Sequence, residues 1–368
     1  MPLHRSLTLR KFVESVENSL IERYFTEKLK DVKLPPHIIM NIEAVEKFMG
    51  DTRNAVARGL IVQDFRKIND LCEKGSSLIV NAYKKYSIPR DDRLKIQGLA
   101  MKLFLDHEEA FDYAYTWYSY YHTSSKVSEH NMLGDFVLTK KKMDDFLKDT
   151  RKWFSDLAKG PECIMMHYDE QDTTVILVEH GSYVRTMAYW KDDKIELISF
   201  RPASEDILLY KKKENKLSIK ASLQKDREQY IKSFSRLIMG DESLAESKDR
   251  DTVYSFEPLR NGKFSWSGTD IIKEIILTEI KIEIPGSTEA VVRIRSKDVL
   301  KTLEEDIHNI SLDSVKIKCV RFRFTIEIDG KKQPVSFMIE PPDVSDLAQK
   351  RHEDIISDYL KKQKVKLK

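Results

Sequence analysis

The chain has 368 residues, of which 63 are Lys or Arg and 60 are Asp or Glu, and its net charge is +3. So small an excess of cations excludes general neutralisation of a polyanion, and any affinity for nucleic acid or a membrane would have to come from a local patch. No apolar run approaches the ~18 residues of a membrane-spanning helix, and Met1–Lys11 lacks the apolar core of a secretory signal. We therefore expect a soluble, cytoplasmic protein of two or three domains with no membrane partner.

The first 158 residues have the apolar spacing of helices. Buried-type residues recur every three or four positions over 9–29 and again over 38–48, and further helices follow to about residue 86. Thr139 is placed to cap a last helix that ends at Leu157. The pattern predicts a helical amino-terminal domain at residues 1–159.

Beyond Gly160-Pro161 the apolar period changes from about 3.6 to 2. Short strands are predicted as an antiparallel meander, followed by a further hairpin, at residues 162–169, 173–179, 183–190, 194–200, 206–210 and 216–221. A helix that ends at Gly240 completes a second domain, 160–245, and the polar stretch 241–251 is the best candidate for a linker. Trp190 and Trp266, next to turns, are interpreted as fillers of small satellite cores.

The third domain, 246–368, contains the firmest local prediction. Asp329-Gly330 is a strong two-residue hairpin turn, and its register places Val320 opposite Ile339, Phe322 opposite Phe337 and Phe324 opposite Val335 on one buried face. Strands are also expected at 273–284 and 289–294 and a helix at 297–309, and Asp343 or Ser345 is placed to cap a terminal helix. The whole chain is expected to be α+β: a helical amino-terminal domain followed by a mostly antiparallel β-rich region with interspersed helices.

Motifs with tight spacing are missing from the sequence. It contains no phosphate-binding Gly-x-x-x-x-Gly-Lys loop, no Gly-x-Gly-x-x-Gly, no Gly-x-Ser-x-Gly and no His-Glu-x-x-His. The enzyme alternative is a metal-dependent nuclease with Glu279 and Lys281 on a strand, holding Mg²⁺ or Mn²⁺. Chance alone predicts about 3.4 Glu-x-Lys triplets against the three present, so the triplet carries no signal. No other cofactor is expected.

A basic sheet face is the better candidate for a site. Side chains alternate along a strand, so the even-numbered Lys316 and Lys318 would face one side and the odd-numbered Arg321 and Arg323 the other. A bulge near Cys319-Val320 would bring all four onto one surface. Arg293 and Arg295 alternate with apolar residues and would extend that surface. The nucleic-acid-binding residues predicted in this way are Arg293, Arg295, Lys316, Lys318, Arg321 and Arg323. Solvent-facing Lys and Arg are also what solubility alone favours.

The segment Phe111–Tyr121 is unusually aromatic. On a helix its rings cover more than half of the circumference, so one core cannot easily bury them all. Burial remains the simplest interpretation, and a partner-binding surface formed by Tyr113, Trp117, Tyr120 and Tyr121 is the alternative. His122 and His130, which flank the run, are interpreted as ordinary surface or capping residues.

These features favour a non-catalytic binding or adaptor subunit. Its partner is expected to be a protein, a nucleic acid or both, engaged through the aromatic helix and the basic sheet face. The sequence does not distinguish DNA from RNA and leaves the oligomeric state open.

Overall fold

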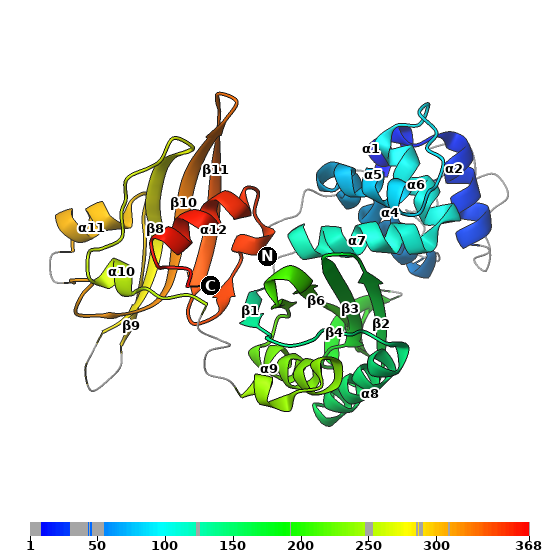
Figure 1. The fold of residues 1–368 in the computed structure, drawn as a ribbon. Helices are drawn as coiled ribbons and strands as arrows, with labels where there is room; N and C mark the ends of the chain where they lie inside the picture. The colour runs from blue at the N-terminus through cyan, green and yellow to red at the C-terminus, as the bar shows by residue number, and fades with distance from the viewer. Residues whose placement is uncertain are drawn as a thin grey trace. The chain divides into compact units, whose positions relative to one another are not determined.

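The computed structural model describes residues 9–29, 43, 45, 55–122, 126–191, 193–246, 253–284, 286, 290–307 and 310–367. The chain forms two compact units, residues 1–123 and 124–368, and each is described here by itself. A helical amino-terminal region precedes a large antiparallel sheet, so the α+β prediction is confirmed (Figure 1). The predicted helix at 38–48 lies almost entirely outside the described residues. Among the described residues, no helix is both long enough and apolar enough to span a membrane.

The first unit is helical. Its described elements are α1 (Leu9–Ser15), α2 (Asn18–Arg23), η1 (Tyr24–Lys28), α4 (Ala55–Lys74), α5 (Ser76–Lys85), α6 (Ile96–Asp106) and α7 (Glu108–His122). The helix expected over 9–29 is interrupted at Glu17, whose backbone is extended. The apolar pattern still marks the buried face correctly, because Phe12, Val16 and Phe25 are all buried.

The second unit is built on a ten-stranded antiparallel sheet. In spatial order its strands are β2 (Cys163–Asp169), β3 (Thr173–Gly181), β6 (Ala203–Lys211), β7 (Lys216–Lys220), β1 (Val127–Asn131), β12 (Val344–Ser345), β11 (Lys331–Glu340), β10 (Lys316–Ile328), β8 (Ile272–Glu283) and β9 (Val291–Arg295). The prediction that residues 1–158 are helical throughout is wrong at Val127–Asn131, which form strand β1. The strand Val-Ser-Glu-His-Asn has no apolar alternation, and pairing with β7 on one side and β12 on the other overrides its polar character.

One end of the sheet is covered by α8 (Lys140–Asp156), α9 (Gln224–Ser233) and η4 (Phe234–Met239). Thr139 caps α8 as predicted, with its hydroxyl accepting from the amide of Lys142 at 3.3 Å. Phe146 and Phe154 anchor α8 in the core of the second unit, although the sequence analysis assigned this helix to the amino-terminal domain. The expected division at 159 and 245 is not tested by these compact units and stays a prediction.

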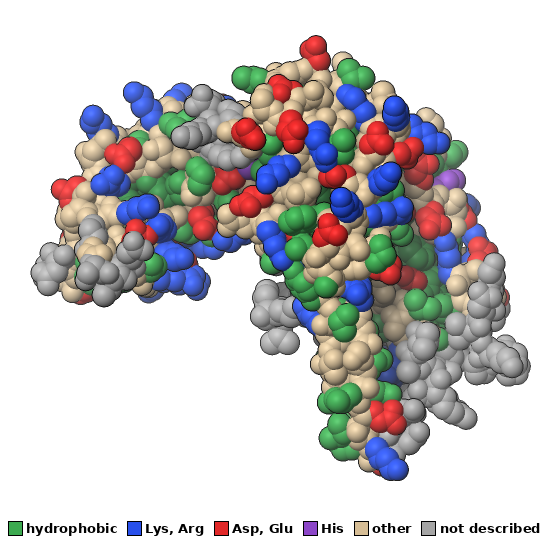
Figure 2. Space-filling model, turned by 90° about the horizontal axis from the view of Figure 1, so that it is seen from below, with side chains coloured by type: hydrophobic (Ala, Val, Ile, Leu, Met, Phe, Trp, Pro, Cys, Tyr) green, Lys and Arg blue, Asp and Glu red, His purple; other side chains and the backbone are tan. Residues whose placement is uncertain are grey.

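The hairpin of β4 (Arg185–Lys191) and β5 (Lys194–Phe200) stands apart from the ten-stranded sheet. The predicted meander would have run through it, but β3 pairs directly with β6, and β4 and β5 pair only with each other among the described strands. Trp190 is 74% exposed, so its interpretation as a core filler is wrong. Figure 2 shows hydrophobic side chains along this projecting hairpin.

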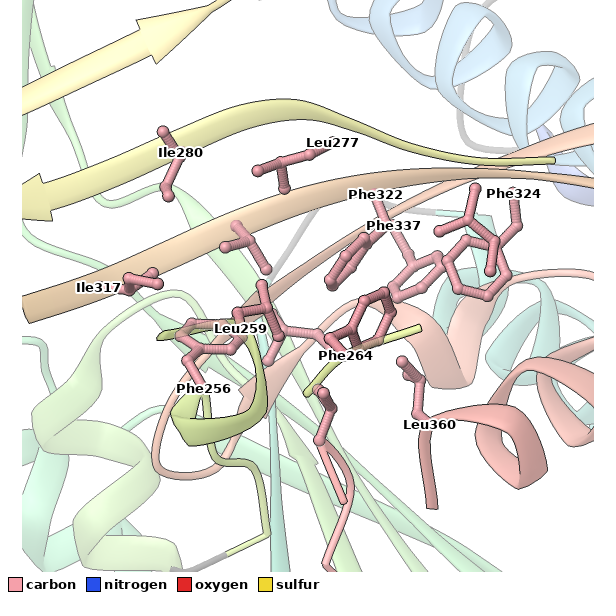
Figure 3. Packing of buried hydrophobic residues seen from close by; sticks show 14 of the residues in the cluster. Phe256, Leu259, Phe264, Leu277, Ile280, Ile317, Phe322, Phe324, Phe337 and Leu360 are labelled. Carbon is pink, nitrogen blue, oxygen red and sulfur yellow. The ribbon is translucent and has the colours of Figure 1, made fainter. Parts of the chain in front are cut away.

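The other end of the sheet has its own core. Here α10 (Glu257–Arg260), α11 (Val299–Glu305) and α12 (Glu353–Lys362) accompany β8–β11, and short turns η3 (Lys212–Glu214), η5 (Glu242–Ala245) and η6 (Leu347–Gln349) complete the described elements. The predicted hairpin register is confirmed, including Phe322 opposite Phe337, and Asp329 and Gly330 both have positive φ, 51° and 72°. Figure 3 shows these two rings gathered with Phe324 and Phe264.

Two smaller predictions about this region have different outcomes. Trp266 packs against the core as expected. The terminal helix begins at Glu353 rather than after Asp343 or Ser345, because Ser345 belongs to strand β12, which pairs with both β1 and β11.

Candidate functional site

The basic sheet face depends on which side chains of β10 point into the core. Phe322 and Phe324 are fully buried, and the alternation of the strand therefore directs Arg321 and Arg323 to the opposite face. The register between β10 and β8 shifts between Ile317 and Cys319, which is the irregularity that the sequence suggested.

The shift brings the two lysines at the start of β10 onto the face of β8 that carries Glu279. The Nζ atom of Lys316 lies 3.9 Å from the carboxylate of Glu283, and Lys318 forms an ion pair with the same carboxylate. Glu283 and Glu279 are four residues apart on β8, so their side chains face the same side of the strand. Lys316, Lys318 and the two arginines of β10 therefore lie on one surface.

Strand β9 adds two further cations. Ile294 is buried, and Arg293 and Arg295, on either side of it, are exposed. Register places Arg295 opposite Glu279 and Arg293 opposite Lys281. Because β8 in turn pairs with β10, Glu279 lies between Arg295 and Arg321 on neighbouring strands.

Side chains of β8, β9 and β10 line an open depression in the surface with a volume of about 710 Å³. Five cations line it: Arg293, Arg295, Lys297, Arg321 and Arg323. Its other lining residues are Thr278, Glu279, Ser296 and Ser336. We call this site the arginine hollow. It unites four of the six predicted residues, whereas Lys316 and Lys318 lie outside its lining, beside Glu283.

Glu279 is the single acid in the arginine hollow, and it is 6% exposed. The guanidinium of Arg293 donates from Nε to Oε1 at 2.8 Å, and its Nη2 lies 2.7 Å from the same oxygen. Arg321 Nε lies 3.8 Å from Oε2. Two nitrogens of the Arg293 guanidinium therefore meet one carboxylate oxygen, and charge-assisted contacts of this kind hold the arginine in place. Glu279 balances one of the five cations, so the hollow keeps an excess of four positive charges.

Lys297 was missed by the sequence analysis. It continues the alternation of Arg293 and Arg295 by two residues, and this spacing was the signal that could have found it. The expected helix over 297–309 concealed the signal, because α11 begins only at Val299, after the cap at Asp298.

The nuclease alternative receives no support from this geometry. Glu279 is paired with arginines, not with another carboxylate. In the part of the chain that the structure describes, no three His, Cys, Asp or Glu side chains are close enough together to hold a metal ion. Glu279 and Lys281 therefore have no neighbouring ligand set for Mg²⁺ or Mn²⁺ there.

The aromatic helix α7 is mostly buried. Tyr113, Trp117 and Tyr120 are 7%, 8% and 1% exposed, whereas Tyr121 is 37% exposed. The ring of Tyr113 packs against Tyr86, and Trp117 stacks on Tyr121 at 5.8 Å between ring centroids. Only Tyr121 of the four residues presents a substantial surface, and a partner-binding role for the group stays a prediction.

A second pocket, of about 470 Å³, was not foreseen. Its lining includes Ser128 and His130 from β1, Arg227 from α9 and Asp343. His130 is 1% exposed, so its interpretation as a surface residue is wrong. Its Nε2 atom lies 2.8 Å from the Ser128 hydroxyl and 3.6 Å from Asp343. One nitrogen meets both groups, whereas a serine protease relay uses a different nitrogen for each.

The three cysteines, Cys72, Cys163 and Cys319, are buried, and none of them forms a disulfide. Burial raises the pKa of the Cys72 thiol to about 12 and those of Cys163 and Cys319 to about 11. Thiols of this kind are poor nucleophiles at neutral pH.

No protein-family model and no curated protein sequence matches the chain.

Proposed function

We propose that the protein is a nucleic-acid-binding module that holds the phosphate backbone in the arginine hollow. The observation that supports this proposal is the convergence of five cations from two strands and a loop around one buried carboxylate. Arginine presents a planar fork that matches the oxygens of a phosphate, and several arginines at strand spacing can contact successive phosphates.

The composition of the hollow favours backbone contacts over base recognition. None of its nine lining residues is aromatic, so it offers no ring on which an unpaired base could stack. Phosphate contacts alone carry no direct sequence information. We therefore expect tighter binding to a duplex, in which phosphates are dense and regularly spaced, than to a single strand, and little dependence on sequence.

The test is a fluorescence-anisotropy titration of labelled DNA and RNA, each as a duplex and as a single strand, over a series of salt concentrations. The variant Arg295→Ala/Arg323→Ala removes two cations of the hollow and preserves the ion pairs of Glu279 with Arg293 and Arg321. We expect weaker binding to every sequence and a fall of about 2 in the slope of log affinity against log salt.

Lys140→Ala/Lys141→Ala is the matched control. Both lysines are exposed at the start of α8, which packs against β2 at the opposite edge of the sheet from β9. This control changes the net charge by the same amount and should preserve the salt slope. Equal losses in the two variants, or no binding of the unaltered protein at low salt, would overturn the proposal.

A further inference from the structure

The β4–β5 hairpin exposes an unusual amount of apolar surface. Every residue from Tyr183 to Phe200 whose side chain the structure describes is exposed. Nine of them are large and apolar, with exposed fractions between 37% and 74%: Tyr183, Val184, Met187, Tyr189, Trp190, Ile195, Leu197, Ile198 and Phe200. A two-stranded hairpin alone is marginally stable in water, and one with such a surface gains stability by burying it.

Register divides the hairpin into two faces. We call one of them the Met187 face. Its central cross-strand pair is Met187 with Ile198, flanked on one side by Arg185 with Phe200 and on the other by Tyr189 with Glu196. On the other face Ala188 lies opposite Leu197 and Trp190 opposite Ile195. An ordinary antiparallel sheet has one apolar face on the core and one polar face in solvent. This hairpin instead exposes large apolar side chains on both faces.

The apolar area of the hairpin, summed over both faces, exceeds that of an ordinary surface patch. With fully exposed large side chains contributing about 150–250 Å² each, the nine residues present on the order of 900 Å². The largest apolar patch of a typical monomer measures about 300–600 Å². A standard interface buries about 800 Å² on each partner. These nine residues include both faces of the hairpin and the two residues before it, and the Met187 face carries four of them, Met187, Tyr189, Ile198 and Phe200. A contact through that face alone is smaller than a standard interface and corresponds to a weak, concentration-dependent dimer.

We propose that the hairpin is a dimerisation arm, and that its occupant is the same arm of a second copy of the chain. A two-fold axis through the Met187–Ile198 pair would set the two arms antiparallel, Met187 face against Met187 face. Arg185 lies one pair to one side of that axis and Glu196 one pair to the other. The antiparallel arrangement therefore sets the Arg185–Phe200 pair of each copy over the Tyr189–Glu196 pair of the other. Arg185 of one copy and Glu196 of the other then lie at the same level of the contact and have opposite charges.

The tip of the hairpin disfavours a bilayer as the occupant. Asp193 and Lys194, which lie there, are charged and exposed. An arm that entered a membrane by its tip would have to desolvate these charges.

The test measures the mass of the protein by light scattering and sedimentation velocity over a range of concentrations. We expect a dimer for the unaltered chain and a monomer for Met187→Asp/Ile198→Asp. Leu133→Asp/Val137→Asp is the matched control, because these residues are also exposed, at 72% and 55%, but lie outside the hairpin. This control should remain dimeric, and a circular-dichroism melt establishes that each variant is folded.

Charge reversal tests the geometry independently of folding. Arg185→Glu and Glu196→Arg should each weaken the dimer, because each places like charges together at both contacts of the two-fold. The double variant should restore it. A monomeric unaltered chain at all concentrations, or a double variant weaker than both single variants, would overturn the proposal. Pelleting of the monomer with phosphatidylserine vesicles would assign the arm to a lipid surface instead.

Discussion

Lys220 is an ammonium group placed almost entirely inside the sheet. It is 2% exposed on β7, with Val127 and Ile207 as its neighbours on the adjacent strands. Burial lowers the pKa of the Lys220 side chain to about 7, and the charge of Glu205 offsets only part of this effect. An unfolded chain holds the same proton up to a pKa of about 10.4, so Lys220 couples folding to pH.

The coupling predicts that Lys220 makes the second unit more stable as pH rises. Below about pH 7 the lysine is charged in both states, and the cost of burying its charge is present in full. Between pH 7 and 10.4 the unfolded state binds the additional proton, so the free energy of unfolding increases by about 2–3 kcal/mol from pH 7 to 9. Lys220→Met should remove this increment in urea unfolding measured at each pH.

Lys140→Met is the control for Lys220→Met, since Lys140 is exposed on α8. It should leave the pH dependence of the unfolding free energy as it is in the unaltered protein. Parallel pH curves for Lys220→Met and the unaltered protein would show that the buried ammonium is not the source of the effect.

Individual residues were predictable where one local rule determined their position. The Asp329-Gly330 turn fixed the partner of Phe322, because a two-residue loop allows only one register. Trp190 was not predictable in this way. Its strand was located correctly, but whether a strand joins the main sheet depends on contacts with residues far away in the sequence.

At the scale of elements, a buried ionic network joins β1 and β7 to the segments at residues 254 and 366. Glu129 on β1 is 2% exposed and accepts a hydrogen bond from the Tyr254 hydroxyl at 2.9 Å. Lys366 Nζ and Lys216 Nζ lie 3.6 and 3.7 Å from its other oxygen. Burial alone would raise the pKa of Glu129, but the charges of Lys366 and Lys216, together with the Tyr254 hydrogen bond and the charge of Lys211, lower the pKa below its usual value.

Glu129→Gln is expected to destabilise the second unit by about 3–5 kcal/mol, because it leaves Lys216 and Lys366 buried without their shared anion. Urea unfolding at neutral pH measures the loss. The lowered pKa means that the charged form of Glu129 stabilises the fold above its unfolded pKa, and that this contribution is lost as pH falls through the folded value. The difference between variant and unaltered protein should therefore shrink in acid.

Glu214→Gln provides the comparison for Glu129. It also removes a carboxylate near Lys216, at 3.4 Å, but the Glu214 side chain is 50% exposed. Exposed pairs contribute about 0–1 kcal/mol. Similar losses in the two variants would contradict the importance of burial for this network.

Elements were predicted best where apolar periodicity was regular. The spacing located α8 and its cap, β10 and β11, and both strands of the projecting hairpin close to their observed bounds. It missed β1, because Ser128, Glu129 and His130 are buried through polar contacts rather than by hydrophobicity. The alternation of arginines located most of the arginine hollow, but which cations line it was set by the pairing of β8 with both β9 and β10.

On the scale of the whole molecule, the near balance of 63 basic and 60 acidic residues conceals a local excess of positive charge. The arginine hollow gathers five cations around one acid. The projecting hairpin likewise gathers apolar side chains that a mean composition does not reveal. Both features lie within residues 124–368, so both proposed interactions belong to the second unit.

This placement predicts that residues 124–368, expressed without the helical unit, bind duplex nucleic acid with the salt slope of the full chain and form the same dimer. The ten-stranded sheet, both of its cores and all five cations of the hollow are contained in that segment. Circular dichroism first establishes that the segment is folded, and anisotropy and sedimentation then provide the two comparisons. A folded segment with a smaller salt slope would show that cations outside it contact phosphate, because each phosphate contact adds about 1 to the slope. A folded segment that stays monomeric while the full chain dimerises would place the dimer contact in the helical unit.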